Sequence, residues 1–188
     1  MARIDPRSRR ARPARGWLAP LLLAGSLAGV AAHAQAPSAE AEAKARFVIT
    51  LARFVQWPAG APPERAALRL CVVHHSPALA AAFASREGTA VTGRPLVLVT
   101  GESVRPGACD LLFVDASAGS AGGESAAAFA GQPVLTLGTV DGFLSRGGMV
   151  ELVNVDDALR FDVSLGPLRA ARLGLSSQAL KLARRVRE

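Results

Sequence analysis

The C-terminal quarter of the chain carries the clearest alternation of apolar and polar residues. Residues 149–155 have strand composition, and residues 159–165 alternate strictly between the two classes. In the second stretch, the side chains predicted to face a core are Leu159, Phe161, Val163 and Leu165, and those predicted to face outward are Arg160, Asp162 and Ser164. Asp156 and Asp157 lie between the two stretches and tolerate tight-turn conformations, so the pattern predicts a β-hairpin.

Two short helices are predicted after this hairpin. Pro167 suits the first turn of a helix that ends near Gly174, where glycine accepts a left-handed conformation. Ser176 or Ser177 then caps a last helix, which is predicted to reach Val186. The residues expected to share the apolar face of that helix are Ala179, Leu182, Ala183 and Val186.

The rest of the chain alternates between predicted helices and strands. Apolar residues recur at helical spacing from Ala41 to Gln56, and Trp57-Pro58 ends this helix because proline disfavours helix at the residue before it. The elements that follow are strands at 68–73, 96–99, 111–114 and 133–137 and helices at 76–84 and 126–129. This order indicates a single-domain α/β fold: a mixed, mostly parallel sheet flanked by helices, with a C-terminal β-hairpin and helix.

The N-terminus has the pattern of a secretory signal peptide. Six arginines lie in residues 1–15, an apolar run follows, and Ala32-His33-Ala34 offers a cleavage site. The run of about 16 residues is shorter than the roughly 20 that a membrane-spanning helix needs, which argues against a membrane anchor. We predict a signal peptide at 1–34, a mobile leader at 35–43, a domain at 44–188 and a periplasmic location. The Sec and twin-arginine export routes both remain open.

The positive charge of the chain belongs mostly to this N-terminal segment. The full chain has 22 basic and 15 acidic residues, whereas residues 35–188 retain 16 and 14, a net charge of +2. A nucleic-acid-binding domain needs a basic stripe on its folded surface, and little of one remains. We therefore predict neither nucleic-acid binding nor membrane insertion after signal cleavage.

No motif for catalysis or cofactor binding emerges from the sequence. Neither a dinucleotide fingerprint nor a phosphate-binding loop follows the first strand, and residues 123–125 lack the closing glycine of a nucleophile elbow. His74 and His75 follow the first strand, where α/β proteins often bind ligands, but adjacent residues of a strand point in opposite directions. We predict no enzyme, cofactor or metal site. Two alternatives remain open: a small-ligand-binding module using both histidines and the loop Gly119–Gly123, and a hydrolase with a serine or aspartate beside either histidine.

Six motifs of the chain also resemble those of one known family. They are Phe-Val-Gln-Trp-Pro at 54–58, Leu-Cys-Val-Val at 70–73, Cys-Asp-Leu-Leu-Phe-Val at 109–114, Gly-Gly-Met-Val at 147–150, Gly-Leu-Ser-Ser at 174–177 and Leu-Lys-Leu-Ala-Arg at 180–184. Their order and spacing over residues 44–186 resemble the YfiR-like family of small periplasmic proteins. The resemblance implies a repressor that contacts the periplasmic sensor domain of an inner-membrane diguanylate cyclase. Such a repressor lowers cyclic di-GMP and restrains biofilm growth.

Cys71 and Cys109 are the two cysteines of the chain. Export would place both in an oxidising compartment, where disulfides persist. Together with the family resemblance, this favours a disulfide between them over two buried free thiols. The bond would tie the first predicted strand of the sheet to the third.

The partner contact is predicted in the C-terminal segment. Arg160 and Asp162 would form a charged rim, which steers association more than it supplies affinity. Leu173 and Leu175 would then anchor the contact, and both are equally interpreted as core residues.

Self-association is predicted as well. The first helix carries few charges, and Val48 or Phe54 would remain partly exposed after one face of the helix packs on the sheet. Exposed apolar patches on small soluble proteins often mark interfaces, so we predict a homodimer.

Overall fold

The structure is a computed structural model that describes residues 38–58, 66–101, 104–119 and 126–188, all within one compact unit. The predicted signal peptide, residues 35–37 of the leader and most of the loop Gly119–Gly123 lie outside the described residues. Among the helices that are described, none is both long and apolar enough to cross a membrane.

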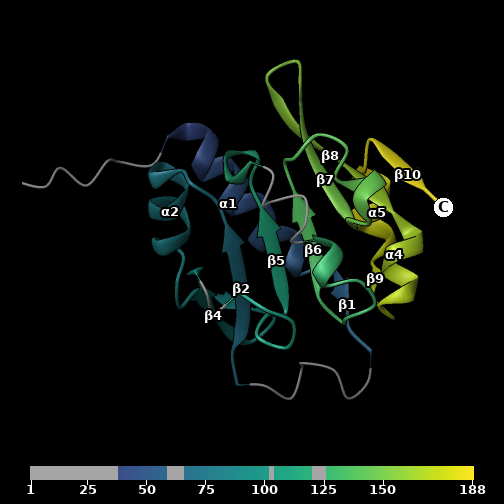
Figure 1. The fold of residues 1–188 in the computed structure, drawn as a ribbon, viewed down its shortest axis with the longest axis horizontal. Helices are drawn as coiled ribbons and strands as arrows, with labels where there is room; N and C mark the ends of the chain where they lie inside the picture. The colour runs from purple at the N-terminus through teal and green to yellow at the C-terminus, as the bar shows by residue number, and fades with distance from the viewer. Residues whose placement is uncertain (1–37, 59–65, 102–103, 120–125) are drawn as a thin grey trace, which may run out of the picture. The chain divides into compact units, whose positions relative to one another are not determined.

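The described strands form an eight-stranded sheet and a two-stranded ribbon. Their bounds are β1 Val55–Gln56, β2 Leu68–Val73, β3 Ala90–Val91, β4 Arg94–Val99, β5 Leu111–Val114, β6 Leu135–Gly138, β7 Val150–Val155, β8 Ala158–Ser164, β9 Gly174–Leu175 and β10 Arg185–Arg187. The large sheet has the order β10-β8-β7-β6-β5-β2-β4-β3, and the ribbon pairs β1 with β9 (Figure 1). Strands β4, β2, β5, β6 and β7 run parallel, as do β8 and β10, whereas β7–β8 and β3–β4 are antiparallel. The predicted α/β fold with a mixed, mostly parallel sheet is confirmed.

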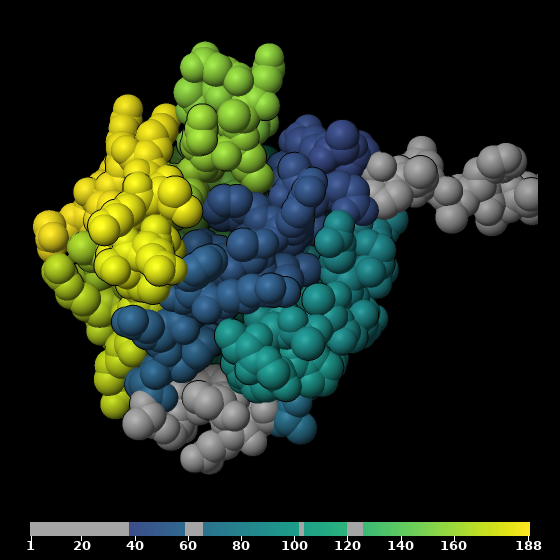
Figure 2. Space-filling model, turned by 180° about the vertical axis from the view of Figure 1, so that it is seen from behind, coloured from purple at the N-terminus to yellow at the C-terminus, as the bar shows by residue number. Residues whose placement is uncertain are grey.

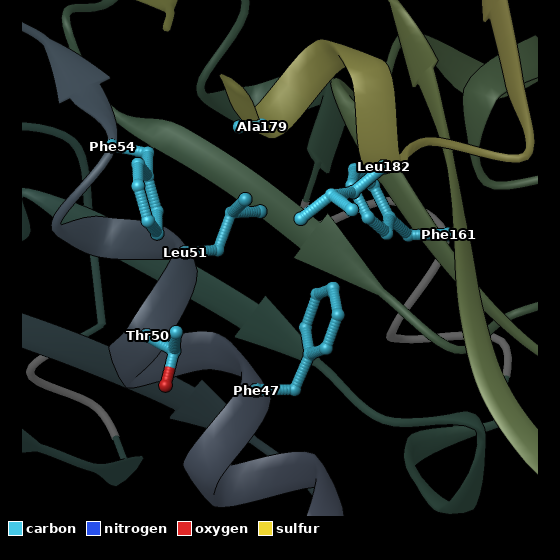
Figure 3. A pocket seen from close by; sticks show the side chains of 7 residues that line it. All are labelled: Phe47, Thr50, Leu51, Phe54, Phe161, Ala179 and Leu182. Atoms are coloured by element: carbon cyan, nitrogen blue, oxygen red, sulfur yellow. The ribbon is translucent and has the colours of Figure 1, made fainter.

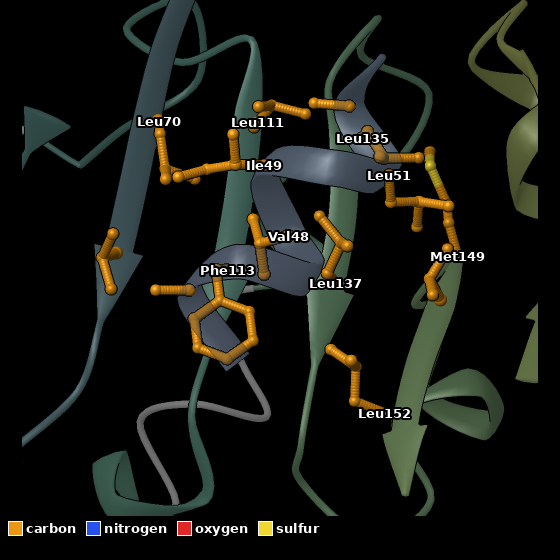
Figure 4. Close-up of a cluster of buried hydrophobic side chains, with 14 of the residues drawn as sticks. Val48, Ile49, Leu51, Leu70, Leu111, Phe113, Leu135, Leu137, Met149 and Leu152 are labelled. Carbon is orange, nitrogen blue, oxygen red and sulfur yellow. The ribbon is translucent and has the colours of Figure 1, made fainter. Parts of the chain in front are cut away.

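One long helix covers the back of the sheet. The helices are α1 Ala39–Ala52, α2 Pro77–Ala84, α4 Leu165–Ala170 and α5 Ser177–Leu182, with 3-10 turns at Ala116–Ala118 and Leu144–Arg146. Residues 126–128 are helical as well. Seen from behind, α1 runs between α2 and the C-terminal residues (Figure 2). Its buried residues Val48, Ile49 and Leu51 lie over the middle strands (Figure 4). α1 therefore closes the main hydrophobic core.

Apolar residues fill both faces of the middle strands. In β5, Leu111 and Phe113 belong to the core under α1, whereas Leu112 and Val114 belong to a second core on the opposite face. Parallel strands buried on both faces show continuous apolar runs rather than alternation. This explains why β5 is predicted correctly to the residue from its composition.

The second core contains the disulfide that the sequence predicts. Cys71 on β2 and Cys109 just before β5 are bonded, with their Cα atoms 5.6 Å apart. Both residues are buried, and β2 and β5 are neighbours in the sheet. The bond thus joins two elements that the sheet already pairs.

The first helix differs from its prediction at both ends. Ser38 caps it by accepting a hydrogen bond from the Ala41 amide, so residues 39–43, predicted as leader, form its first turn. The helix ends at Ala52 rather than Gln56, because Val55 and Gln56 pair with Leu175 and Gly174. A tertiary strand pairing here overrides the helical spacing.

The last helix is also shorter than predicted. α5 ends at Leu182, Ala183 is extended, and Arg185–Arg187 continue as β10 alongside β8. The prediction that this helix reaches Val186 is therefore wrong. The alternation of polar and apolar residues in Arg185, Val186 and Arg187 is typical of a strand, so this pattern could have predicted β10 from the sequence.

Candidate protein-binding surface

An ion pair between the exposed Arg184 and the buried Asp162 holds the C-terminal strand to the sheet. The Arg184 backbone N–H donates to the Phe161 carbonyl at 2.8 Å, and its Nε donates to Asp162 Oδ1, also at 2.8 Å. A second guanidinium nitrogen of Arg184 donates to Asp162 Oδ2, which makes the pair bidentate. This pair fixes the point at which the chain leaves α5 and enters β10.

The burial of Asp162 corrects its predicted place. Asp162 was expected to face outward, but it is 2% exposed because β10 and Arg184 cover it. The hydrogen bond from Arg184 lowers the pKa of Asp162 against the opposing effect of burial, and the same bond raises the pKa of Arg184. Asp162 is therefore a structural anchor within this protein rather than a rim residue open to a partner.

The other predicted partner-binding residues divide between surface and core. Arg160 is exposed, as predicted. Leu173 and Leu175 are each 6% exposed and belong to the main core, so the structure supports their interpretation as core residues. Leu175 is held there by the pairing of β9 with β1. Of the four predicted residues, Arg160 is the one that the surface offers.

An apolar groove lies between α1 and α5. It has a volume of about 70 Å³ and is lined by Phe47, Thr50, Leu51, Phe54, Phe161, Ala179 and Leu182 (Figure 3). Phe47 of α1 and Phe161 of β8 form a tilted ring pair with centroids 5.2 Å apart. The groove thus joins the long helix, an outer strand of the sheet and the last helix in one surface, which we call the apolar groove.

Exposed apolar side chains gather beside this groove. Leu182 is 73% exposed and Val186 is 45% exposed, and they lie within the last seven residues of the chain. Val186 is in register with Val163 on β8, so its side chain lies on the same face as Phe161. Both had been predicted as the buried face of a longer helix. Because α5 stops at Leu182, the chain exposes them instead.

A second cluster lies where the parallel strands end. Asp115 follows β5 and is 4% exposed; its Oδ2 accepts hydrogen bonds from Lys44 Nζ at 3.0 Å and Thr139 Oγ1 at 2.9 Å. Its Oδ1 accepts from the Ser117 amide at 3.0 Å, and Lys44 also pairs with Glu40 at 2.8 Å. This cluster ties α1 to the carboxyl edge of β5 and β6.

The charges of this cluster are strongly stabilised. Burial acts to raise the pKa of Asp115, but hydrogen bonds from Ser117, Lys44 and Thr139 outweigh it and lower the pKa to about 2. Burial acts to lower the pKa of Lys44, but its bonds to Glu40 and Asp115 prevail and raise it. Both groups are therefore charged at neutral pH, and their bonding capacity is used within the protein.

A larger polar groove adjoins this cluster. It has a volume of about 480 Å³, and its lining residues are Glu40, Lys44, Ala116, Thr139, Asp141, Leu152, Val153, Asn154 and Arg184. Its two cations, Lys44 and Arg184, already pair with Asp115 and Asp162. A ligand would have to compete with those carboxylates.

The two histidines lie apart from this polar groove. His74 Nδ1 accepts a hydrogen bond from the Ser76 amide at 3.2 Å, and the His75 amide donates to Ser117 Oγ at 3.1 Å. Neither histidine is among the residues that line the polar groove. The ligand-binding alternative puts both histidines and the loop Gly119–Gly123 around one pocket, and most of that loop lies outside the described residues. Within the described ranges, no three His, Cys, Asp or Glu side chains lie close enough together to hold a metal ion.

The fold and its surfaces define a small α/β protein with an exposed apolar patch at its C-terminus. Comparison with known families gives the affiliation: residues 41–184 match the DUF4154 family, described as YfiR/HmsC-like. The chain belongs to this family, which is periplasmic, regulatory and non-catalytic. No match is found among curated proteins.

A comparison with solved structures finds a conserved domain protein from Vibrio cholerae O1 biovar El Tor, whose crystal structure is known. The similarity has a TM-score of 0.49 and 12% sequence identity, and covers 78% of this chain. The chain spans 60% of the length of that protein.

Proposed function

We propose that this protein is a periplasmic regulator that binds the periplasmic part of a membrane-anchored diguanylate cyclase and represses it. The observation that carries the proposal is the family match over residues 41–184, nearly all of the described domain. The exposed apolar residues beside α5 support it, because such patches on small proteins often mark interfaces. In this role the protein acts on cyclic di-GMP levels through its partner.

Deletion of the gene tests the proposal. Cellular cyclic di-GMP is expected to rise on deletion, because the cyclase is released from repression. It should return to the starting level when an exported copy is supplied, and stay high with a copy lacking residues 1–34, which would remain in the cytoplasm. An unchanged level in a strain shown to express the protein would contradict the repressor role.

A ligand-binding sensor module is the second candidate. The polar groove of about 480 Å³ favours it, because ligands of open α/β sheets bind outside the carboxyl ends of the strands. A substitution in the polar groove separates the two: Asn154→Ala removes a neutral amide from its lining, which would weaken ligand binding and leave repression intact. Repression that disappears with Asn154→Ala would join the two functions in one protein.

The predicted homodimer stays a part of the proposal without an assigned surface. Val48, one of the two residues expected to remain exposed, is completely buried, and Phe54 is half-buried in the apolar groove. Packing of α1 against the sheet explains the burial of Val48. Sedimentation at micromolar concentration should show a dimer, and a pure monomer would contradict the homodimer prediction.

A further inference from the structure

We propose that the polar groove binds an extended, uncharged segment of the partner protein, which adds to the open edge of β7 as an extra strand. The inference rests on the proposed function and deepens it, since it names an element that recognises the partner and the chemistry of the partner segment. Three observations carry it: the unpaired backbone of β7, the position of the groove above the end of β6, and the balanced charge of its lining.

The outer half of β7 lacks a neighbouring strand on one side. β6 pairs with β7 at Val150 and Glu151 and no further, whereas β8 pairs with β7 along its whole length to Val155. Figure 1 shows the β7–β8 hairpin rising beyond the carboxyl ends of β5 and β6. A two-stranded hairpin by itself is marginally stable, and a third strand stabilises it. Residues 152–155 therefore offer a place for one more strand.

The hydrogen bonds of the hairpin show which backbone groups face this open edge. The Ser164 amide donates to the Met149 carbonyl at 2.9 Å, so Met149 directs its backbone groups toward β8. Along an antiparallel pair, residues alternate between directing these groups toward the partner strand and away from it. Leu152 and Asn154 therefore direct theirs away from β8, toward the open edge.

The pairing of β8 with β10 agrees with this alternation. Phe161 lies opposite Leu152, so its backbone groups should also point out of the hairpin. The Phe161 carbonyl accepts a hydrogen bond from the Arg184 amide at 2.8 Å, on the side of β8 where β10 lies. The two edges of the hairpin thus follow the same alternation.

Three backbone groups of the β7 edge are open. The parallel ladder from β6 ends with the pair of Gly138 and Glu151, so it reaches at most the N–H of Leu152. The Leu152 carbonyl and both backbone groups of Asn154 lie beyond it, and the described residues supply no hydrogen bond to them. An added strand of about three residues can pair with all three groups.

The polar groove lies along this same edge. Leu152, Val153 and Asn154 line it, together with Thr139 and Ala116, which follow β6 and β5. Because β6 lies between β7 and β5, a strand added to β7 would lie above the end of β6, inside the groove. The groove volume of about 480 Å³ is within the range of well-formed binding sites.

The lining of the groove is electrically balanced. Its acidic residues are Glu40 and Asp141, and its basic residues are Lys44 and Arg184. Both cations are already paired with carboxylates of the protein. A charged ligand would have to displace one of these partners, whereas a peptide backbone needs only the neutral donor and acceptors of β7. The groove therefore favours an uncharged extended segment.

Two other edges of the sheet are protected against strand addition. On β4, the Leu98 N–H donates to the Glu87 carboxylate at 3.4 Å, and on β10, Arg185 and Arg187 are exposed. Charged side chains at an edge disfavour pairing with another chain. Residues 152–155 of β7 include no charged residue and no proline. The β7 edge thus lacks the protection that β4 and β10 carry.

A second copy of this chain does not suit the groove. Its β7 would arrive with β8 bonded along the other side, so two strands would have to enter together. Ala116, which follows β5, lines the groove beyond the single strand position above β6. The occupant is therefore one extended segment with both of its edges free.

The test begins with the exported full-length protein in living cells. A photo-crosslinking amino acid replaces Asp141, an exposed residue that lines the groove, and the crosslinked partner peptide is sequenced by mass spectrometry. A synthetic peptide of that sequence is then titrated into the purified protein without the crosslinker. Amide hydrogen exchange of residues 152–155 is measured with and without the peptide.

The variants separate the backbone of the edge from its side chains. Asn154→Pro removes the outward N–H but leaves the β7–β8 ladder intact, because that N–H takes no part in it. Asn154→Ala keeps the N–H and removes the side chain. Leu159→Pro is the matched control, since Leu159 lies opposite Asn154 and directs its N–H to the other edge of the hairpin.

N-methylated peptides test the same pairing without any change to the protein. In an added strand, alternate backbone nitrogens face β7 and the intervening ones face away. Methylation at successive positions should therefore weaken binding in an alternating pattern. These peptides decide the question if Asn154→Pro melts more than a few degrees below the wild type.

The peptide is expected to slow exchange of the Asn154 amide at least about tenfold. Asn154→Pro should raise the Kd about tenfold, whereas Asn154→Ala and Leu159→Pro should change it less than about twofold. Aspartate or lysine at the centre of the peptide should also weaken binding. A crosslink to a second copy or to no protein, an equal Kd for wild type and a stably folded Asn154→Pro, or an equal effect of methylation at every position would overturn the inference.

Failure of the inference and failure of the proposed function are distinguishable. If deletion raises cyclic di-GMP but a stably folded Asn154→Pro copy represses normally, the groove is not the contact and the repressor role stands. If deletion leaves cyclic di-GMP unchanged while the crosslinked peptide shows the alternating pattern, the groove binds a strand of another protein and the repressor role fails.

Discussion

All four residues of β5, in the middle of the sheet, are buried, whereas all three residues of β10, at its C-terminal edge, are exposed. β5 is paired on both sides, packed on both faces and braced by the disulfide beneath it. β10 is paired on one side and held mainly by the bidentate pair of Arg184 with Asp162. The middle of the sheet is fully buried by contacts within the protein, whereas the C-terminal edge leaves Leu182 and Val186 exposed to solvent.

This difference separates stability from recognition within one small domain. Local stability follows the density of buried contacts, so the middle of the sheet should open only with global unfolding. The C-terminal edge has fewer such contacts and carries the exposed apolar residues. Substitutions in the middle of the sheet should therefore change the free energy of unfolding strongly, and substitutions at the C-terminal edge should change it less.

Removal of the disulfide should have the largest effect. The bond closes a loop with a sequence separation of 38, and chain entropy then gives about 4 kcal/mol for the free energy of unfolding. Cys71→Ala with Cys109→Ala should lower this free energy by up to that amount in urea titrations. Reduced wild-type protein is the control and should match it. A double variant as stable as the oxidised protein would show that the disulfide does not stabilise the fold.

A methyl group at Gly148 should destabilise the second core next. A Cβ there would lie 2.8 Å from the Phe143 backbone oxygen and closer still to its ring. Overpacking of this kind costs about 1–3 kcal/mol, so Gly148→Ala should lower the melting temperature. Gly166→Ala is the matched control, because its Cβ would meet nothing within 4 Å. Equal melting temperatures for both variants would show that Phe143 can move aside.

Asp115→Asn should cost about 2 kcal/mol at neutral pH, and the cost should depend on pH. The folded pKa of about 2 lies below the ordinary value of 3.8, so the carboxylate stabilises the fold above pH 4. That contribution is lost as the pH falls from about 4 to 2. The stability gap between wild type and variant, measured by urea unfolding, should therefore be constant from pH 5 to 7 and shrink below pH 4. A gap that widens on acidification would refute this account.

Arg184→Ala should loosen the C-terminal edge, with a smaller effect on the free energy of unfolding than Asp115→Asn, since it leaves the buried Asp162 without its cation. Hydrogen exchange should accelerate in residues 185–187 and remain unchanged in β5. Arg184→Lys keeps the charge but not the bidentate geometry, so it should show an intermediate rate. Unchanged exchange at β10 in the alanine variant would mean that strand pairing alone holds the edge.

Leu182→Ala should change the free energy of unfolding least, by about 0.5 kcal/mol or less, because the side chain is 73% exposed. Leu168→Ala provides the contrast, since Leu168 is 1% exposed and its truncation should cost about 2–5 kcal/mol. Thermal melts of the two variants compare these losses of stability. A large loss for Leu182→Ala would place that residue with the core rather than with the binding surface.

The local pattern of the sequence determined the middle of this protein. β2 and β5 have their predicted bounds, and α2 begins at Pro77 under the Ser76 cap, as the sequence indicates. The hairpin turn also matches, because Asp156 and Asp157 both adopt positive φ angles of 49° and 57°. In these segments the residues that set the structure are neighbours in the chain, so composition and spacing suffice.

Only the tertiary structure decided the sites. Lys44, Asp115 and Thr139 lie far apart in the sequence and meet because α1 crosses the carboxyl ends of β5 and β6. Asp162 looks like a surface residue until β10 returns and covers it, and Leu182 looks like a core residue until its helix stops early. Hydrophobic periodicity records how a residue sits within its own element, whereas burial at the edge of a sheet depends on which distant strand pairs there.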